Sequence, residues 1–209
     1  MISVLYVDDD LSLLEIGKLF LERTGEFQVE LRDSAVKAVD LLKTTTFDII
    51  ISDYEMPVMN GLEFLKEVRS TLGEIPFILF TGRGREEVVI QALNDGADYY
   101  LQKGGDPKPQ FVELTHKMKL AVQRRNISIE LKESEQRYRE VVETQSEFIC
   151  RFTPEGITVF VNEAYCRYFG KRREEIIGQR FSPDIPKDDR EKVRTHFVSL
   201  TQDSPVGEI

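Results

Sequence analysis

Short apolar runs and helical stripes alternate along the first hundred residues. The runs predict five strands, at residues 2–7, 27–31, 47–52, 75–80 and 99–101. Between the runs, apolar residues recur every three or four positions, as in amphipathic helices; these stripes are Leu13, Ile16 and Phe20, then Ala35, Ala38, Val39 and Leu42, then Leu62, Leu65 and Val68, then Val88, Val89, Ala92 and Leu93. Strands that alternate with helices predict an α/β fold built on a doubly wound, five-stranded parallel sheet.

A fifth, long helix is expected to follow Pro109. Residues 111–143 contain neither Gly nor Pro and are rich in charge, so they can form one continuous helix. Some apolar positions fit a heptad seam, namely Leu120, Ile127, Leu131, Tyr138 and Val141, whereas Arg124 and Ser134 interrupt it. Two interpretations remain open: a solvated linker helix, or a coiled coil that pairs two copies of the chain.

The pattern changes after this helix. Residues 148–152 and 157–161 read as two strands joined by a turn at Pro154-Glu155-Gly156. Short helices are expected from Asn162 to Gly170 and from Arg172 to Ile176, and a last helix is expected after a cap at Asp188 or Asp189. We therefore predict three parts: a domain at 1–125, a helical linker at 126–143 and an α+β domain at 144–209.

Composition narrows the function classes. The chain has 209 residues, of which 41% are hydrophobic, and a net charge of −9, which argues against a general nucleic-acid surface. No apolar run approaches the length of a membrane span, and the first residues lack the basic start of a signal peptide. Cys150 and Cys166 form no disulfide framework. We expect a cytoplasmic protein that engages neither nucleic acid nor membrane.

Charged and hydroxyl side chains follow the predicted strands at the point where each ends. They are Asp8, Asp9, Asp53, Thr81 and Lys103. Ligands of such sheets bind outside the carboxyl ends of the strands, so these side chains are expected to meet. Clustered carboxylates repel one another unless a cation joins them, and oxygen ligands suit Mg²⁺. An Asp at such a site can accept a phosphoryl group covalently, with a lysine to neutralise phosphoryl charge.

These segments resemble the receiver domains of response regulators. The resemblance covers about residues 1–125 and is carried by Val4-Leu5-Tyr6-Val7-Asp8-Asp9-Asp10, Asp53-Tyr54-Glu55-Met56-Pro57-Val58-Met59-Asn60-Gly61, Thr81-Gly82 and Tyr100-Leu101-Gln102-Lys103. It implies a flavodoxin-like fold, and it makes Asp53 the phosphoacceptor. It also implies a Mg²⁺ site made by Asp9 and Asp53, the backbone carbonyl of Glu55, and Asp8 through a metal-bound water.

The same resemblance implies a switch. Thr81 and Tyr100 would form the switch pair, and Lys103 would pair with the phosphoryl group. One position departs from the family: a Pro usually follows this lysine, often with a cis bond, and here Gly104-Gly105 stands in its place. Because of this departure, the resemblance does not predict the conformation of the loop after Lys103. The expected role of Lys103 is unaffected.

Two alternatives concern the same residues. Asp8 and Asp10 have the spacing found in aspartate-nucleophile phosphatases of the haloacid dehalogenase type, in which Asp8 would attack and Asp10 would act as acid and base. That hypothesis gives no reason for the Asp53 loop. The other alternative is a receiver that serves only as structure and is never phosphorylated.

Residues 136–209 resemble the first half of a PAS sensor domain. The resemblance is carried by Gln136-Arg137-Tyr138, Phe148-Ile149-Cys150-Arg151-Phe152, Asn162-Glu163-Ala164, Tyr165-Cys166-Arg167-Tyr168-Phe169-Gly170 and Arg173-Glu174-Glu175-Ile176-Ile177-Gly178. Such domains need further strands, so we expect the sequence to be part of a longer protein.

No ligand of the PAS region can be named from the sequence. Cys166 lacks the sequence around a flavin-reactive cysteine and reads as a buried apolar residue. His196 on the last predicted helix is the candidate for a haem ligand, and a solvated or core histidine is the simpler interpretation. His116 does not lie in a phosphoacceptor box of a histidine kinase.

Together these features predict two-component phosphorelay signalling rather than a separate enzyme. The partner would be a histidine kinase, in trans or in a longer form of the same chain. A homodimer through the last receiver helix and the linker is a further expectation.

Overall fold

The computed structural model describes residues 1–82, 86–180, 191 and 195. It divides into two compact units, Met1–Glu133 and Ser134–Ile209, and helix α5 (Pro107–Thr144) contributes to both. The expectation of one uninterrupted helix after the fifth strand is confirmed. The helix begins two residues before Pro109 because Asp106 accepts a hydrogen bond from the backbone N–H of Lys108, and proline is tolerated in a first turn.

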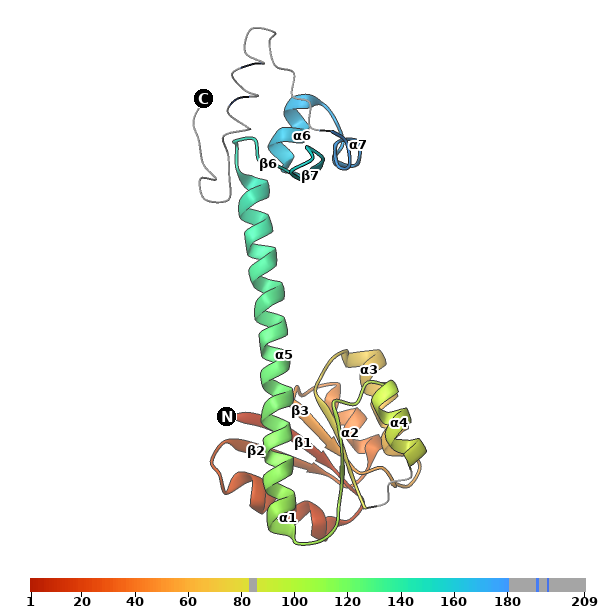
Figure 1. The fold of residues 1–209 in the computed structure, drawn as a ribbon. Coiled ribbons are helices and arrows are strands. Elements are labelled where there is room, and N and C mark those ends of the chain that lie inside the picture. Colours follow the sequence, from red (N-terminus) through yellow and green to blue (C-terminus); the bar gives the residue numbers. More distant parts are fainter. Residues whose placement is uncertain (83–85, 181–190, 192–194, 196–209) are drawn as a thin grey trace. The chain divides into compact units, whose positions relative to one another are not determined.

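The first unit is a five-stranded parallel sheet with helices on both faces (Figure 1). The strands lie in the order β2-β1-β3-β4-β5. Their bounds are β1 Ile2–Val7, β2 Phe27–Arg32, β3 Ile49–Ser52, β4 Phe77–Thr81 and β5 Tyr99–Gln102, and the intervening helices are α1 Leu11–Glu22, α2 Ala35–Leu42, α3 Gly61–Leu72 and α4 Glu86–Asn94. The predicted doubly wound α/β fold is confirmed.

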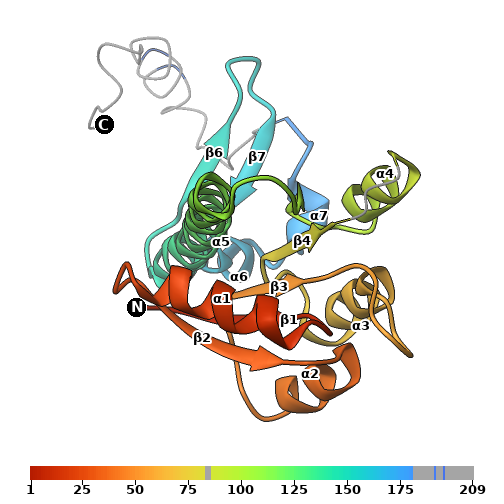
Figure 2. The same cartoon turned by 90° about the horizontal axis from the view of Figure 1, so that it is seen from below.

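Side chains of the central strands alternate between two hydrophobic layers. Val4 and Tyr6 of β1 face the layer under α1 and α5, whereas Leu5 and Val7 face the layer under α2, α3 and α4. Figure 2 shows α1 and α5 on one side of the sheet and α2 and α3 on the other. Because both faces are covered, the central strands are apolar almost throughout.

Helix α1 is turned by about one residue from its predicted orientation. Its buried positions are Leu14, Gly17 and Leu21, whereas Ile16 of the predicted stripe is 43% exposed. A Cβ atom on Gly17 would lie 2.4 Å from Cε1 of Tyr6, so the glycine allows α1 to pack on the ring of this buried tyrosine. A stripe count cannot detect a glycine that faces the core.

The second unit begins with the last turns of α5. It contains an antiparallel pair, β6 Cys150–Phe152 and β7 Thr158–Val161, and the short helices α6 Glu163–Phe169 and α7 Arg173–Ile176. The predicted hairpin and both predicted short helices are confirmed. The last predicted helix, with its Asp188 or Asp189 cap, and His196 lie outside the described residues.

A buried asparagine joins the elements of this unit. Asn162 accepts hydrogen bonds from the N–H groups of Ile149 and Tyr165, and donates to the carbonyl oxygens of Val142 and Glu147. All four bonds are between 2.8 and 3.2 Å long. Since a buried amide with every partner in place fixes geometry, Asn162 holds the end of α5 against the hairpin and α6.

Candidate functional site

Four elements of the parallel sheet bring the predicted site residues to one edge. Asp8 follows β1, Asp53 follows β3, Thr81 ends β4 and Lys103 follows β5. The strand hydrogen bonding continues past the strands, since the N–H of Asp53 donates to Val7 and that of Lys103 donates to Thr81, at 2.8 and 2.7 Å. The carboxyl-end rule therefore located these four residues correctly.

Lys103 lies between two buried carboxylates. Its Nζ is 2.5 Å from Oδ2 of Asp8 and 2.7 Å from Oδ1 of Asp53. Asp8 is 1% exposed and Asp53 6%, so both charges are largely removed from water. Burial raises the pKa of Asp8, and the Lys103 ammonium opposes that rise. One ammonium group thus lies within ion-pair distance of two carboxylates.

The loop after Asp53 holds this carboxylate in a fixed place. Its second oxygen, Oδ2, accepts a 2.7 Å hydrogen bond from the N–H of Glu55. The loop then closes tightly on α3, where Gly61 donates to the carbonyl of Tyr54. A Cβ atom on Gly61 would lie 2.2 Å from the backbone oxygen of Asp53, so only glycine permits this approach.

Strain accompanies this loop. Val58 has a φ of 71° and is 94% exposed. A β-branched residue is rarely found in this left-handed region, and its side chain makes no compensating burial there. Backbone strain of this kind is characteristic of functional loops. The motif match named Val58 as part of the loop, and nothing in the sequence indicated its conformation.

The site suits a hard cation by its donor chemistry, although no ready-made cage is present. Among the described residues, no three His, Cys, Asp or Glu side chains are arranged to hold a metal. Lys103 takes the space between Asp8 and Asp53, and Asp9 is exposed beside them. All candidate donors are oxygens, and each carboxylate oxygen has lone-pair capacity beyond its present bond. The residues therefore fit Mg²⁺.

Comparison with protein families agrees with this geometry. A model described as "Response regulator receiver domain" matches residues 4–114, and one described as "PAS fold" matches residues 136–208. The chain belongs to the response regulator receiver family. A PAS region follows the receiver.

Curated relatives match about half of this chain. Response regulator Rre1 of Synechocystis is 36% identical over 108 residues, which cover 51% of this chain and 47% of the relative. Response regulator SaeR of Staphylococcus aureus is 34% identical, covering 52% and 46%. The chain thus matches about half the length of these relatives.

Solved structures repeat the receiver fold. The receiver domain of Francisella response regulator 1452 has a TM-score of 0.54 at 27% identity, and the alignment covers 59% of this chain and 98% of that one. The chemotaxis response regulator CheY4 of Vibrio cholerae has a TM-score of 0.52 at 30% identity, and the alignment covers 56% of this chain and 98% of that one.

In the described part of the present chain, no helix has the length and apolar character needed to cross a membrane.

Asp9 and Asp10 of the receiver have different surroundings from Asp8. Both are exposed. The carboxylate of Asp10 caps α1, accepting from the N–H groups of Ser12 and Leu13 at 2.9 and 3.2 Å. A carboxylate bound to the first turn of α1 in this way is not free to act as an acid or base for a substrate at Asp8. Together with the family assignment, this arrangement leaves the phosphatase hypothesis without structural support.

Thr81 and Tyr100 of the receiver lie on adjacent strands. Thr81 is buried, with 2% of its surface exposed. Tyr100 of β5 pairs with Leu79 of β4, which lies two residues before Thr81. The hydroxyl of Tyr100 is buried and, within the described residues, has no hydrogen-bond partner. Burial raises the pKa of the Tyr100 hydroxyl, and the negative charge of Asp53 raises it further, as the smaller of the two effects. A buried hydroxyl without a hydrogen-bond partner costs free energy.

The glycines after Lys103 have a backbone that proline cannot adopt. Gly104 has a φ of 146° and Gly105 a φ of 82°, whereas proline is fixed near −65°. The loop that the sequence left open therefore has a conformation of its own in this receiver. Lys103 still reaches both carboxylates, so its position does not depend on a proline after it.

Proposed function

We propose that the receiver accepts a phosphoryl group on Asp53 from the phosphohistidine of a histidine kinase, with Mg²⁺, and passes the resulting change to the PAS region. The observation that carries this proposal is the buried Asp53 carboxylate, held by Lys103 on one oxygen and by the Glu55 N–H on the other. The family assignment supports the same role.

The chemistry needs little beyond positioning and charge. An oxygen of Asp53 attacks phosphorus, the phosphorus–nitrogen bond of the donor breaks, and its electron pair returns to the imidazole. The product is an acyl phosphate on Asp53. Lys103 then neutralises phosphoryl oxygens as a mobile point charge, because its four-carbon stem allows the ammonium to turn from the carboxylates. Thr81 donates its hydroxyl to another phosphoryl oxygen.

The metal site in this proposal uses Asp9, Asp53 and the backbone carbonyl of Glu55, with Asp8 joined through water. When bound there, Mg²⁺ would supply positive charge to the phosphoryl oxygens. Asp9 fits the part of a ligand that reaches the ion from the solvent side, because it is exposed beside the buried pair. Asp8 takes the indirect role by its likeness to the family, and its 1% exposure leaves it set back from the solvent side where Asp9 lies.

The signal is proposed to travel through Thr81, Tyr100 and α5. When Thr81 turns to the phosphoryl group, space opens behind it and Tyr100 changes position. The two-state equilibrium shifts because the phosphoryl group binds one arrangement of Thr81 better than the other. Helix α5 continues directly from the receiver into the PAS region, so it is the covalent route for the change.

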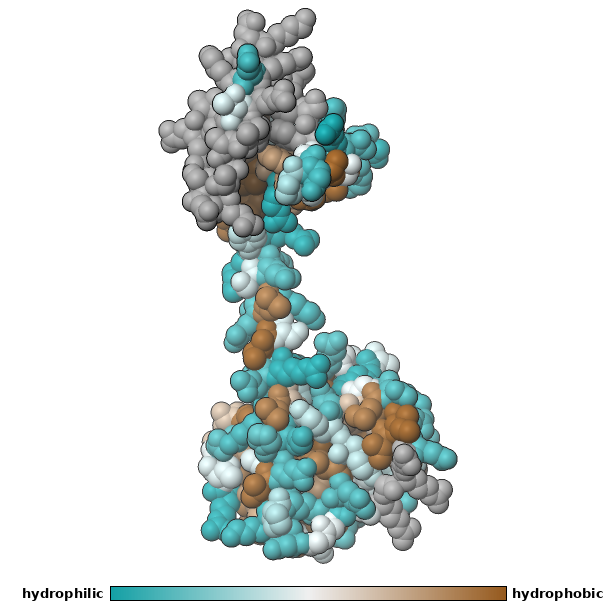
Figure 3. All heavy atoms as spheres, in the orientation of Figure 1, coloured by the Kyte–Doolittle hydropathy of each residue, from teal (hydrophilic) through white to brown (hydrophobic). Residues whose placement is uncertain are grey.

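A second copy of the chain is the proposed partner of α5. From Phe111 to Val122 the inward face of α5 packs on the sheet, whereas Ile127 and Leu131 are 56% and 59% exposed. Figure 3 shows hydrophobic side chains on the surface of this helix. Pairing of two helices would cover them.

The proposal also includes a cytoplasmic location, which agrees with the free thiols of Cys150 and Cys166. It includes no nucleic-acid partner and no membrane partner.

Labelling with a small phosphodonor tests the proposed function. The parent should take up phosphate from acetyl phosphate when Mg²⁺ is present, and a chelator should prevent it. Asp53→Asn should take up none, whereas the control Asp48→Asn should be labelled like the parent, since Asp48 bonds to Ser3 at the other end of the sheet. An unlabelled parent would instead support a receiver that serves only as structure.

A further inference from the structure

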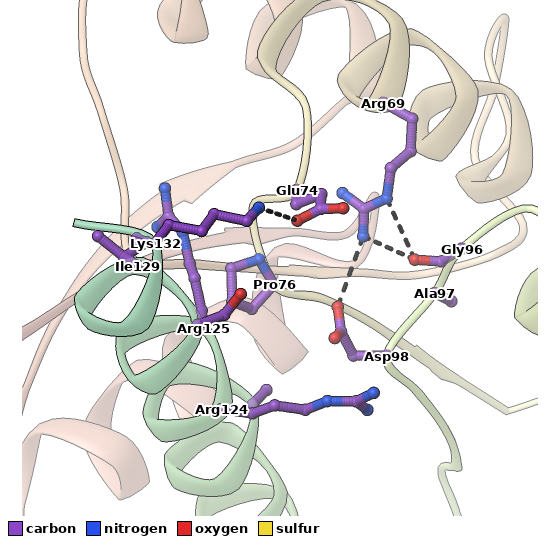
Figure 4. Close-up of a pocket in the computed structure, with 12 residues that line it drawn as sticks. Arg69, Glu74, Pro76, Gly96, Ala97, Asp98, Arg124, Arg125, Ile129 and Lys132 are labelled. Atoms are coloured by element: carbon purple, nitrogen blue, oxygen red, sulfur yellow. Dashed lines mark hydrogen bonds and ion pairs between the residues drawn. The ribbon is translucent and has the colours of Figure 1, made fainter. Parts of the chain in front are cut away.

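A second polar pocket lies at the edge of the receiver sheet opposite Asp53. It is a cavity of about 640 Å³, within the roughly 300–1,000 Å³ of small-molecule sites. Residues just before β4 and β5, namely Pro76, Ala97 and Asp98, form one side of it, and the stretch of α5 from Ala121 to Lys132 forms the other. Figure 4 shows these two sides, with the basic side chains of α5 projecting from the helix.

Arg69 makes the sheet side of the pocket rigid. Its guanidinium donates to the carbonyl oxygens of Gly73, Ile75 and Gly96 at 2.7 to 3.1 Å, and it lies 3.5 Å from the Asp98 carboxylate. These bonds tie the end of α3 to the starts of β4 and β5. Figure 4 shows the bonds of Arg69 to Gly96 and Asp98. The wall is thus fixed, and the charge of Arg69 is largely committed to it.

The basic groups on the helix side are not committed in this way. Within the described residues, Arg124 and Arg125 have no ion-pair or hydrogen-bond partner for their guanidinium groups. Lys132 lies 4.0 Å from Glu74, and both side chains are mostly exposed, so this pair is weak. Arginine forks match phosphate and carboxylate groups with two parallel hydrogen bonds.

Charge and spacing define the kind of ligand. The lining has four cations, Arg69, Arg124, Arg125 and Lys132, against the two anions Glu74 and Asp98, which leaves a net charge of +2 in a chain of net charge −9. Arg124 and Lys132 are eight positions apart, a rise of about 12 Å along a helix. A ligand with two or more anionic groups can therefore engage both charges at once. Among the described residues that line the pocket none is aromatic, so the lining offers no ring for a base to stack on.

We propose that this pocket binds a small polyanion that carries two or more phosphate or carboxylate groups. Such a ligand would join Arg124, Arg125 and Lys132 of α5 to the fixed wall of the sheet. It would thereby stabilise the segment of α5 at the end of the receiver against the starts of β4 and β5. At their other ends, β4 finishes with Thr81 and β5 leads into Lys103. This site is independent of the proposed phosphorylation of Asp53.

Calorimetric titration of the 209-residue protein tests the proposal. The probes are tripolyphosphate and citrate, with inorganic phosphate as the single-anion comparison, and a chelator removes divalent metal. At least one of the two polyanions should bind saturably and more tightly than phosphate. Which of them binds better distinguishes a phosphorylated ligand from a polycarboxylate.

Charge-removing variants place the binding. Arg124→Gln and Lys132→Gln should each weaken binding about tenfold, the loss of a charge-assisted hydrogen bond. The matched control is Arg139→Gln, which removes the same charge from an exposed position of α5 outside the pocket and should bind like the parent. The proposal is overturned if neither polyanion binds saturably, or if all three variants bind equally well.

Discussion

Lys103 compensates two buried carboxylates with one charge, and this imbalance has consequences for stability. A buried anion costs free energy unless it is paired, and a like-charged neighbour adds to the cost. Asp8 and Asp53 share Lys103 at 2.5 and 2.7 Å, so neither has a cation to itself. The second carboxylate is therefore a cost to the stability of the resting fold.

Substitutions at this group should change stability in opposite directions. Lys103→Gln leaves two unpaired buried carboxylates and should lower the free energy of unfolding by about 3 kcal/mol, whereas Asp8→Asn removes the excess charge and should raise it by about 1 kcal/mol. Urea unfolding without Mg²⁺ measures both. A stabilising Lys103→Gln would show that the carboxylates are not ionised together.

Asp9 and Asp10 provide a test variant and a matched control for the proposed Mg²⁺ site. Asp9→Ala should weaken Mg²⁺ binding at least about tenfold, which is 1.4 kcal/mol at one decade. Asp10→Ala removes an equal charge one residue away, and it should leave Mg²⁺ affinity near that of the parent while it costs about 1 kcal/mol through the lost α1 cap. Calorimetric titration with Mg²⁺ compares them, and equal affinities in both variants would remove Asp9 from the metal site.

At the scale of elements, the sequence predicted the order of strands and helices because buried strands and amphipathic helices differ in period. Its errors have local causes. Phe47 is buried as predicted, yet β3 begins only at Ile49, because Asp48 is held by Ser3 in the connection. The site residues followed from the strand ends, whereas the bridging position of Lys103 and the strain at Val58 depend on tertiary contacts that no local pattern encodes.

Gly61 decides how closely α3 approaches the Asp53 loop. Gly61→Ala should lower the free energy of unfolding by about 2 kcal/mol, because the nearest atom to its new Cβ would be the backbone oxygen of Asp53, which cannot turn aside as a side chain can. Gly82→Ala is the control, since a Cβ there meets nothing within 4 Å, and it should change stability by less than about 0.5 kcal/mol. Thermal unfolding separates the two, and equal effects would show that the loop relaxes freely.

At the scale of the whole molecule, the described residues form two units that share α5, and each unit holds its own part of that helix. Met118 and Ala121 pack on the receiver sheet, and Val142 accepts a bond from Asn162 in the PAS region. Between these anchored ends α5 is exposed and charged. The sequence predicted a continuous helix there because helix breakers are absent, but it could not choose between a solvated linker and a paired one.

Activation should therefore be visible along this helix. With beryllofluoride and Mg²⁺, hydrogen exchange should change around Tyr100 and in α5 beyond Val122, and light scattering should report a change in association. Thr81→Ala should lose both responses, because the trigger hydroxyl is gone. An unresponsive parent would contradict the switch, and a response that persists in Thr81→Ala would remove Thr81 as the trigger.

The most direct measurement of the central claim is the identity of the phosphorylated residue. The parent and Asp8→Asn are treated with acetyl phosphate and Mg²⁺, the acyl phosphate is reduced to a stable product, and the modified peptide is sequenced by mass spectrometry. We predict modification at Asp53 in the parent, and at the same residue, in smaller yield, in Asp8→Asn. Modification of Asp8 in the parent, or of a residue away from the carboxyl edge of the sheet, would contradict the account.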